Sequence, residues 1–396
     1  MFAIVSNRAP SSAYPSPVLA TLAMMLAPLP KIDPAALRAT VEKLASWQNR
    51  HTASKGLEEA AEWIAGEYRK IPGAKVEIMR YPIVKGPRVP EDKETVEVLC
   101  RLEPTADPLP GLVIMGGHMD SINMLGPADV TLRAPGANDD GSGAAATLEV
   151  ARAMASRPRR HPMLFVAFSG EEQGLLGSGA LAARAKKESW PVDAVLSNDM
   201  IGNSRNGTGR HDDKHLRVFS EAVETHQGRE LARFIEWLQR TEGQKGHSVK
   251  LVFRRDRFGR GGDHTPFNNA GFTAVRLTEM VEDYTHQHTP NDLPEHMDFP
   301  YLARNAMVNL LTVDRLANAG VAPTRVRIDR KQSHDTTLTW TATPGTSYVV
   351  YWRDTASGTW EHAQKVGAVA TIRLDVDKDN TEFAVGAEGG IPVPAL

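Results

Sequence analysis

Hydrophobic residues recur with different periodicities along the first 320 positions of the chain. Residues 33–69 carry apolar side chains every three or four positions, which predicts helices with one buried face. Residues 76–81 and 96–102 alternate between apolar and polar side chains, as strands do. Four short, continuous apolar runs are typical of strands buried on both faces: 111–116, 163–168, 194–196 and 274–277.

The order of these elements indicates the fold class. Residues 143–154, between the first two apolar runs, are rich in alanine and favour a helix. A strand, a helix and another strand in succession indicate an α/β sheet with parallel members. We therefore predict a mixed α/β domain over residues 33–320, with a largely parallel central sheet flanked by helices.

A different pattern begins at residue 323. Short alternating runs separated by turn residues occupy 325–328, 337–340, 348–352, 371–374 and 382–385. They predict a small all-β sandwich over residues 323–396. Its early Trp340 and the strand from Tyr348 to Arg353 resemble a fibronectin type III module, which is expected to contact a surface, a glycan or a partner.

Composition narrows the classes of function. The chain of 396 residues is 41% hydrophobic and 24% charged, as soluble globular proteins are. Its net charge of -2, without a strongly basic domain, argues against a nucleic-acid partner. The single cysteine, Cys100, excludes an intrachain disulfide and a cysteine-rich zinc site. Any metal must therefore be held by His, Asp and Glu.

Five residues of these types follow candidate buried strands. They are His118, Asp139, Glu172, Asp199 and His288. Open α/β sheets place their sites where the carboxyl ends of strands meet. Two zinc ions about 3.5–4 Å apart need one bridging carboxylate and roughly two further ligands each. The set is sufficient for two Zn²⁺ ions per chain.

Neighbouring residues could support such a site. Glu171 points differently from Glu172 and can accept a proton from a metal-bridging water. Asp120, two residues from His118, can accept the free N–H of that imidazole. Asp263 could do the same for His288.

Each residue also has an ordinary interpretation when it is taken alone. Asp139 and Asp140 stand in a Gly/Ser-rich turn, where they could cap a helix. Glu171 and Glu172 could form a solvated first helical turn. His264 and His286 are rival ligands. Only the whole set favours a metal site, because together the five residues complete one.

With these residues, the chain resembles the clan MH zinc aminopeptidases. This group includes bacterial leucyl aminopeptidases and aminopeptidase Y and is related to glutamate carboxypeptidase II. Flanking similarity extends from about 35 to 318. The matching motifs are His118-Met119-Asp120, Asn138-Asp139-Asp140-Gly141-Ser142-Gly143, Ser169-Gly170-Glu171-Glu172, Asn198-Asp199-Met200 and His288-Thr289-Pro290-Asn291-Asp292.

The resemblance implies a role for each residue. It puts His118 and Asp199 on one zinc, Glu172 and His288 on the other, and Asp139 on both. It implies that Glu171 is the general base. It also implies a cis peptide bond between Asp139 and Asp140, of which Asp140 is not a ligand.

The expected activity is removal of the N-terminal amino acid from a peptide with a free N-terminus. Met200, Met280 and Tyr284 are candidates for an apolar substrate pocket, with core packing as the alternative. The long polar stretch 202–250 is a candidate for part of the substrate cleft.

Three alternatives stay open. One is a carboxypeptidase or dipeptidase of the same clan, in which an arginine binds the substrate carboxylate; the candidates are Arg254, Arg255, Arg257 and Arg260, which otherwise form a solvated basic loop. Another is a glutaminyl cyclase, expected to use one zinc in the animal type. The last is a non-catalytic receptor-like domain.

Residues 1–32 form a separate N-terminal segment. Its apolar run 18–28 resembles the core of a signal peptide and is too short for a transmembrane span. Only Arg8 precedes the run as a positive charge, and an N-terminal helix or a misassigned start are the alternatives. With the family resemblance, the segment favours a secreted or periplasmic bacterial protein over a cytoplasmic one.

Overall fold

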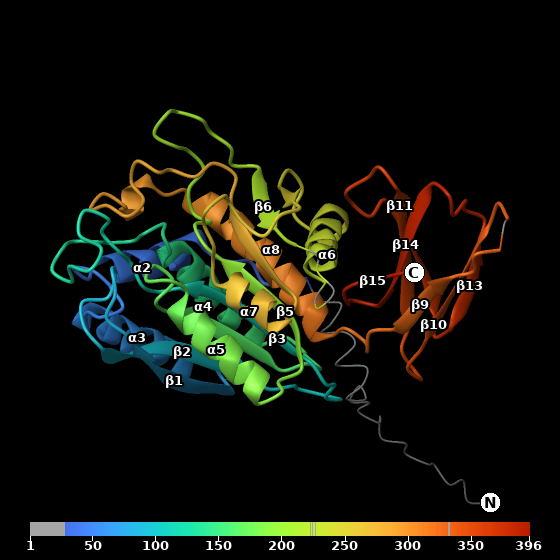
Figure 1. The fold of residues 1–396 in the computed structure, drawn as a ribbon, viewed down its shortest axis with the longest axis horizontal. Coiled ribbons are helices and arrows are strands. Elements are labelled where there is room, and N and C mark those ends of the chain that lie inside the picture. Colours follow the sequence, from blue (N-terminus) through green and yellow to red (C-terminus); the bar gives the residue numbers. More distant parts are fainter. Residues whose placement is uncertain (1–27, 222, 224, 226, 332) are drawn as a thin grey trace, which may run out of the picture.

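The computed structural model describes residues 28–221, 223, 225, 227–331 and 333–396 (Figure 1). The expected signal-peptide-like run falls largely on residues 1–27, outside the described residues. The helices that position the site are α2 (Pro34–Ala45), α3 (Lys55–Arg69), α4 (Gly141–Ala155), α5 (Leu176–Lys187), α6 (Gly228–Thr241), α7 (His264–Ala270) and α8 (Phe299–Ala317), with a short 3-10 helix η1 (Pro294–His296) before α8.

A mixed sheet of eight described strands forms the centre of the molecule. In chain order the strands are β1 (Ala74–Ile83), β2 (Lys93–Leu102), β3 (Leu112–His118), β4 (Met163–Phe168), β5 (Val192–Asn198), β6 (His215–Phe219), β7 (Ser248–Val252) and β8 (Ala274–Glu279). Their order across the sheet is β1-β2-β4-β3-β5-β8-β6-β7. The central strands β4, β3, β5 and β8 are mutually parallel. The strands β1 and β2 pair antiparallel with their neighbours, whereas β6 is antiparallel to β8 and parallel to β7. The predicted α/β class is confirmed.

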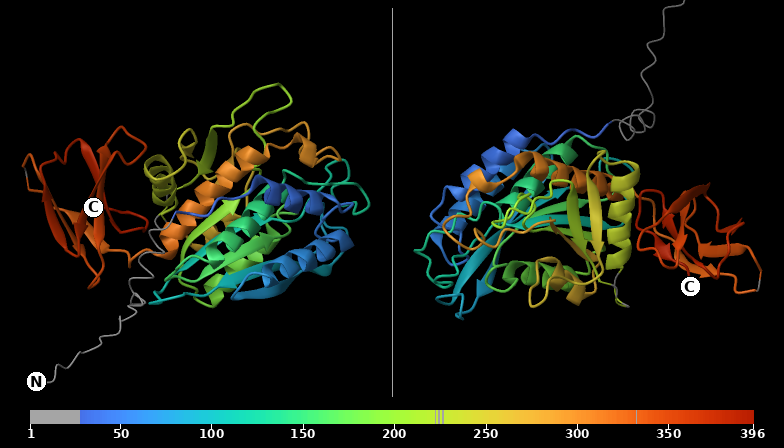
Figure 2. Two further views of the ribbon diagram at one scale, coloured as in Figure 1. Left: turned by 180° about the vertical axis from the view of Figure 1, so that it is seen from behind. Right: turned by 90° about the horizontal axis from the view of Figure 1, so that it is seen from above.

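The continuous apolar runs arise because both faces of the central strands are covered. On β4, Phe165 and Ala167 face one hydrophobic core, whereas Val166 and Phe168 face the other. Helices α2, α3, α4, α6 and α8 contribute to the first core, and α5 and α7 contribute to the second, so helices cover both faces of the sheet (Figure 2). Such strands have no polar face, and their sequence therefore does not alternate.

Of the described part of the polar stretch 202–250, a candidate for part of the substrate cleft, Asn203 alone lines a pocket beside the candidate ligands. Much of the stretch forms β6, α6 and β7, of which β6 and β7 make the far edge of the sheet. Leu216 and Val218 of β6 are buried in the large core, and Leu231, Phe234 and Leu238 of α6 pack in the same core. The pattern is hard to recognise because the strands have only five residues each, too few for a clear period.

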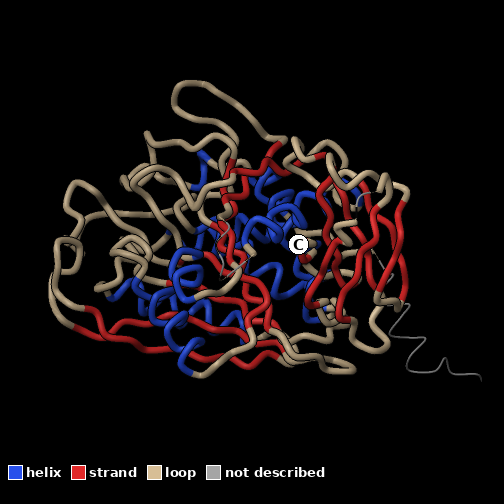
Figure 3. The backbone as a smooth tube through the Cα atoms, turned by 45° about the vertical axis from the view of Figure 1, so that its right-hand side comes forward, coloured by secondary structure: helices blue, strands red, loops and turns tan. Residues whose placement is uncertain are grey.

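The C-terminal part is built from two antiparallel sheets (Figure 3). One has the order β13-β10-β9 and the other β12-β11-β14-β15. Trp340, Tyr348, Val350, Phe383 and Val385 belong to the core of this part. The strands are β9 (Thr324–Ile328), β10 (Thr336–Thr341), β11 (Tyr348–Asp354), β12 (His362–Gly367), β13 (Thr371–Leu374), β14 (Thr381–Ala387) and β15 (Val393–Pro394). Likeness to a fibronectin type III module stays a prediction.

The C-terminal sheets dock on α6. The ring of Trp237 on α6 meets Tyr351 edge to face, with centroids 5.6 Å apart. Arg233 Nε donates to the carbonyl of Gly358 at 3.0 Å, and Arg240 donates to the carbonyl of Trp360. This interface combines an aromatic contact with hydrogen bonds to two backbone carbonyls.

Among the described helices, none combines the length and the apolar character that crossing a bilayer requires.

Candidate active site

The strand ends bring the candidate ligands to one edge of the sheet. His118 is the last residue of β3, and Asp199 directly follows β5. Glu172 lies in the loop after β4, next to β3 in the sheet. Asp139 comes from the turn that precedes α4, and His288 from the loop after β8. Four neighbouring parallel strands thus lead to the same place.

Asp139 lies between the two histidines. Its Oδ1 is 3.1 Å from Nε2 of His118, and its Oδ2 is 3.0 Å from Nε2 of His288. Nε2 of His288 also lies 3.1 Å from Oε1 of Glu172, and Nε2 of His118 lies 3.9 Å from Oδ1 of Asp199. Asp139 therefore belongs to two groups whose ligand atoms lie within 4.8 Å of one another: His118, Asp139 and Asp199, and Asp139, Glu172 and His288.

The donor set fits zinc. Imidazole nitrogen and carboxylate oxygen are ligands that zinc accepts, and the two groups share one carboxylate. Within the described chain, Nε2 of His118 and Oε1 of Glu172 are buried, and apart from the contacts among the candidate ligands neither atom has a hydrogen-bond partner. Buried polar atoms normally have a partner, so these two are suited to a ligand.

Asp140 connects the strand ends that carry the site. Its Oδ2 accepts the backbone N–H of His118 at 3.0 Å. Its Oδ1 accepts the N–H of Gly143 at 2.8 Å and that of Met200 at 3.1 Å. Asp140 is thus the N-cap of α4 as well as a link between β3 and β5. The peptide bond between Asp139 and Asp140 is cis, as the resemblance implies.

Gly143 is required at this cap. A Cβ atom there would lie 2.3 Å from Oδ2 of Asp140 and 2.8 Å from the carbonyl oxygen of Asn198. Neither neighbour can withdraw, because the carboxylate is held by its hydrogen bonds and the carbonyl belongs to β5. The Gly-rich turn therefore allows α4 to start against the strand ends.

Asp292 fixes the backbone of the shared ligand. Its Oδ1 accepts the N–H of Asn138 and its Oδ2 accepts the N–H of Asp139, each at 3.0 Å. Burial raises the pKa of Asp292 to about 7, although these two hydrogen bonds act in the opposite direction. Asp292 ends the motif that begins at His288, and no role was predicted for it from the sequence.

Asp120 contacts both His118 and the glutamate loop. Its Oδ1 is 3.4 Å from Nδ1 of His118, close to the predicted position. Its two oxygens also accept the N–H groups of Glu171 and Glu172, at 3.3 and 3.2 Å. The same carboxylate thus orients an imidazole and the loop after β4, and the second contact was not predicted.

Glu171 lines the cleft beside the candidate ligands. Burial raises its pKa well above the usual value; nearby His118 opposes the shift, and the Asp199 and Glu172 carboxylates add to it. A carboxyl group with a raised pKa can both take up and release a proton near neutral pH.

Arg276 is a site residue that the sequence analysis did not single out. It is fully buried on β8, and its Nη2 lies 2.8 Å from Oδ2 of Asp199. Its Nη1 lies 3.0 Å from Asp256. Despite burial, Asp199 and Asp256 raise the pKa of its guanidinium. An arginine inside the apolar run 274–277 was the available signal, since a buried charge needs a partner.

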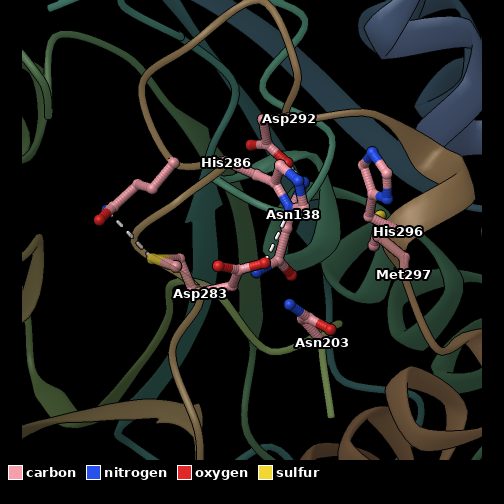
Figure 4. Close-up of a pocket in the computed structure, with 9 residues that line it drawn as sticks. Asn138, Asn203, Asp283, His286, Asp292, His296 and Met297 are labelled. Atoms are coloured by element: carbon pink, nitrogen blue, oxygen red, sulfur yellow. Dashed lines mark hydrogen bonds and ion pairs between the residues drawn. The ribbon is translucent and has the colours of Figure 1, made fainter. Parts of the chain in front are cut away.

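A small polar pocket lies beside this cluster (Figure 4). Met200, which the sequence offered as a substrate-pocket residue, lines it. The side-chain amide of Gln287 donates hydrogen bonds to the carboxylate of Asp139 and to the sulfur of Met200. Met280 and Tyr284 line neither this pocket nor the cleft. The other residues around the pocket are Asn138, Asn203, Asp283, His286, Asp292, His296 and Met297.

Three residues that the sequence offered for the metal site, Asp263, His264 and His286, belong to neither ligand group. Oδ1 of Asp263 is buried and makes no hydrogen bond among the described residues, and its role beside His288 stays a prediction. His264 contacts the carbonyl of Arg255 through Nε2 at 2.8 Å. His286 stacks on His296 with centroids 4.0 Å apart. These contacts leave His288 as the histidine beside Asp139 and Glu172.

The cleft over the site has a volume of about 520 Å³. Of the four arginines that the sequence offered as carboxylate ligands, Arg257 and Arg260 line it. Arg255 instead pairs with Glu221 at 2.7 Å, and Arg254 stacks on Phe258 at 4.4 Å. Arg88, from the turn between β1 and β2, also lines the cleft.

Known proteins resemble the chain over most of its length. A probable zinc metalloprotease of Leptosphaeria maculans is 35% identical over 401 residues, which cover 91% of this chain and 92% of the relative. Another from Pyricularia oryzae is 36% identical over 411 residues, covering 92% and 81%.

Solved structures share the fold. BSAP, a zinc aminopeptidase from Bacillus subtilis, has a TM-score of 0.58 at 16% identity, over 74% of this chain and 97% of that one. A glutaminyl cyclase from Porphyromonas gingivalis has a TM-score of 0.55 at 16% identity, over 72% of this chain and 100% of the cyclase. At such identities the likeness concerns the fold alone.

The family model described as Peptidase family M28 matches residues 97–313, a range that contains every candidate ligand. The match covers more than half of the chain and agrees with the resemblance to clan MH peptidases. The chain belongs to Peptidase family M28.

Proposed function

We propose that this chain is an aminopeptidase that binds two zinc ions and hydrolyses the N-terminal peptide bond of peptides. One observation carries the proposal: the carboxylate of Asp139 reaches both His118 and His288, at 3.1 and 3.0 Å. His118 and Asp199 would hold one ion, and Glu172 and His288 the other, with Asp139 shared. Membership of a peptidase family and relatives named probable zinc metalloproteases support the metal and the reaction class.

Zinc, when bound, supplies Lewis-acid polarisation of the scissile carbonyl and lowers the pKa of water. Asp120 prepares one ligand for this role. Its carboxylate lies beside Nδ1 of His118, which favours the tautomer with a proton on Nδ1. The lone pair of Nε2 is then free and points toward Asp139 and Asp199.

Glu171 would move the proton. It faces the cleft next to the candidate ligands, and Asp120 accepts its backbone N–H. Its carboxylate takes one proton from the attacking water and afterwards gives that proton to the nitrogen of the departing amine. The peptide C–N bond is broken, the new C–O bond is formed, and Glu171 returns to its starting state.

A glutaminyl cyclase is the second candidate, because cyclases share this fold. The two activities give different products from one peptide. From Gln-Ala-Phe with a free N-terminus, an aminopeptidase releases glutamine, whereas a cyclase releases ammonia and keeps the peptide intact. A carboxypeptidase releases phenylalanine.

The test is mass spectrometry of the products from Gln-Ala-Phe and from its N-acetylated form, with zinc-loaded protein. We expect glutamine from the free peptide and no cleavage of the acetylated one. Release of phenylalanine from both, or ammonia loss without cleavage, would overturn the aminopeptidase proposal. No product from either peptide would favour the non-catalytic alternative.

A further inference from the structure

Three arginines line the cleft above the candidate ligands: Arg88, Arg257 and Arg260. We call them the arginine rim. Arg88 comes from the turn between β1 and β2, and the other two come from the loop between β7 and α7. Segments far apart in the sequence thus bring guanidinium groups to the same cleft.

The charges of the cleft do not cancel without a further anion. The carboxylates that line it are Asp139, Glu171, Glu172 and Asp199. Two divalent ions would offset these four negative charges. Arg88 and Arg260, which are in none of the described ion pairs, then remain as an excess of positive charge, so the filled site would attract an anionic group.

Arg88 is held in place without an acidic partner. Its Nη1 donates to the carbonyl of Glu172 at 2.6 Å, and its own carbonyl contacts Nε2 of His51 at 3.0 Å. The ion pairs of the described chain do not include Arg88, and the residue is exposed. A guanidinium tethered by one nitrogen still has donors for a substrate.

Arg260, like Arg88, has no acidic partner among the described ion pairs. Its guanidinium lies 5.6 Å from the ring centroid of Tyr284, and none of the described ion pairs involves it. Stacking on an aromatic face orients the guanidinium and leaves its N–H edge open. Tyr284, which the sequence offered as a pocket residue, therefore acts here through Arg260.

Arg257 is the fixed member of the rim. Its side chain is 9% exposed and lies 3.1 Å from Asp256, and it also pairs with Glu282. Asp256 is shared with Arg276, and Glu282 is shared with Arg217. Asp199, the other partner of Arg276, would be committed to the metal. Arg217, Arg257 and Arg276 would then share the two carboxylates of Asp256 and Glu282.

We propose that the arginine rim binds a carboxylate of the substrate, so that the preferred substrates are short peptides with an acidic group close to the scissile bond. This inference rests on the proposed aminopeptidase function. Arg pairs with carboxylates through two parallel N–H bonds, which gives both affinity and orientation. The carboxylate would come from the C-terminus of a dipeptide or from an acidic side chain that follows the scissile bond.

The test compares three peptides with the same N-terminal residue and zinc-loaded enzyme: Ala-Ala, Ala-Ala amide and Ala-Glu amide. Only the first has a C-terminal carboxylate, and only the last has an acidic side chain. We expect kcat/KM of at least one carboxylate-bearing peptide to exceed that of Ala-Ala amide by about tenfold, mainly through a lower KM. The peptide with the larger gain identifies the source of the carboxylate.

The variants Arg88→Gln and Arg260→Gln should remove most of that preference, so that kcat/KM for the carboxylate-bearing peptide falls toward the value for Ala-Ala amide. Both residues are exposed, so the variants should fold. Arg254→Gln is the matched control, because Arg254 lies in the same loop and stacks on Phe258 outside the cleft.

Two results would overturn the proposal that the arginine rim binds a substrate carboxylate. One is equal cleavage of all three peptides, and the other is a preference that survives Arg88→Gln and Arg260→Gln combined. In both cases the amide is still cleaved, so the aminopeptidase proposal stands. If the enzyme cleaves none of the three free-amine peptides, the proposed function itself fails and the rim proposal fails with it.

Discussion

The carboxylate of Asp140 accepts the backbone N–H of His118 at 3.0 Å, which joins the start of α4 to the end of β3. Its other oxygen accepts the N–H groups of Gly143 and Met200. Asp140 is completely buried, so these donors have no access to water in its place. The residue beside the shared ligand Asp139 therefore sets the relative position of the strand ends.

Removing this carboxylate should destabilise the protein strongly. In Asp140→Ala three backbone N–H groups lose their acceptor, and each buried donor left alone costs about 1–3 kcal/mol. We expect the free energy of unfolding of the metal-free protein to fall by about 3 kcal/mol or more in urea titrations. Asp129→Ala is the control, since the exposed carboxylate of Asp129 accepts hydrogen bonds from nearby Thr131. Equal stability of the two variants would contradict this role.

Glu171→Gln should separate metal binding from catalysis. The amide keeps the shape of the side chain but cannot accept a proton from water, so kcat should fall by at least about 100-fold. The five candidate ligands remain, so zinc content should not change. Glu188→Gln, on the surface beside Arg184, serves as the control. A fully active Glu171→Gln enzyme would refute the assignment of the general base.

The sequence predicted the parts of the site that lie at strand ends. His118, Glu172 and Asp199 follow apolar runs, and a run that is buried on both faces ends where the parallel strands converge. Asp139 and His288 lie farther from their strands, and the family resemblance rather than any period assigned their roles.

The rest depended on contacts between distant segments. The hydrogen bonds of Asp292 to Asn138 and Asp139 cross more than 150 residues, and no local pattern announces them. Asp263 was assigned to His288 on weak local grounds, and its buried Oδ1 makes no hydrogen bond among the described residues. The short strands β6 and β7 were missed because five residues carry too little periodicity.

The docking of the C-terminal sheets should depend on Trp237. Its ring packs against Tyr351 across the interface with α6. We expect Trp237→Ala to speed proteolysis in the connection at residues 318–323 and to lower stability by about 2 kcal/mol. Trp352→Ala removes a tryptophan that stacks on His362 within the C-terminal part, and it should leave proteolysis of the connection as in the wild type. Unchanged proteolysis of Trp237→Ala would show that the ring does not hold the interface.

His247 should make stability depend on pH. Burial lowers its pKa from 6.5 to about 4, although its hydrogen bond to Asn305 acts in the opposite direction. Between these pH values the unfolded chain binds a proton at His247 that the folded chain does not. Stability contributed by neutral His247 is therefore present above pH 6.5 and is lost as the pH falls toward 4.

His247→Gln tests this effect, because glutamine can still donate to Asn305 but does not titrate. The difference in free energy of unfolding between wild type and variant should shift against the wild type as the pH falls from about 6.5 to 4. Urea titrations at several pH values measure it, and a difference that stays constant would contradict the prediction.

The central claim is that Asp139 serves two metal ions at once. Zinc titration into chelator-treated protein, with bound zinc and hydrolysis of Ala-Ala amide followed together, tests it most directly. We predict binding of two zinc ions per chain, and for Asp139→Asn a loss of affinity at both sites. Saturation at one zinc ion, or an Asp139→Asn protein that still binds two as tightly, would contradict a shared carboxylate.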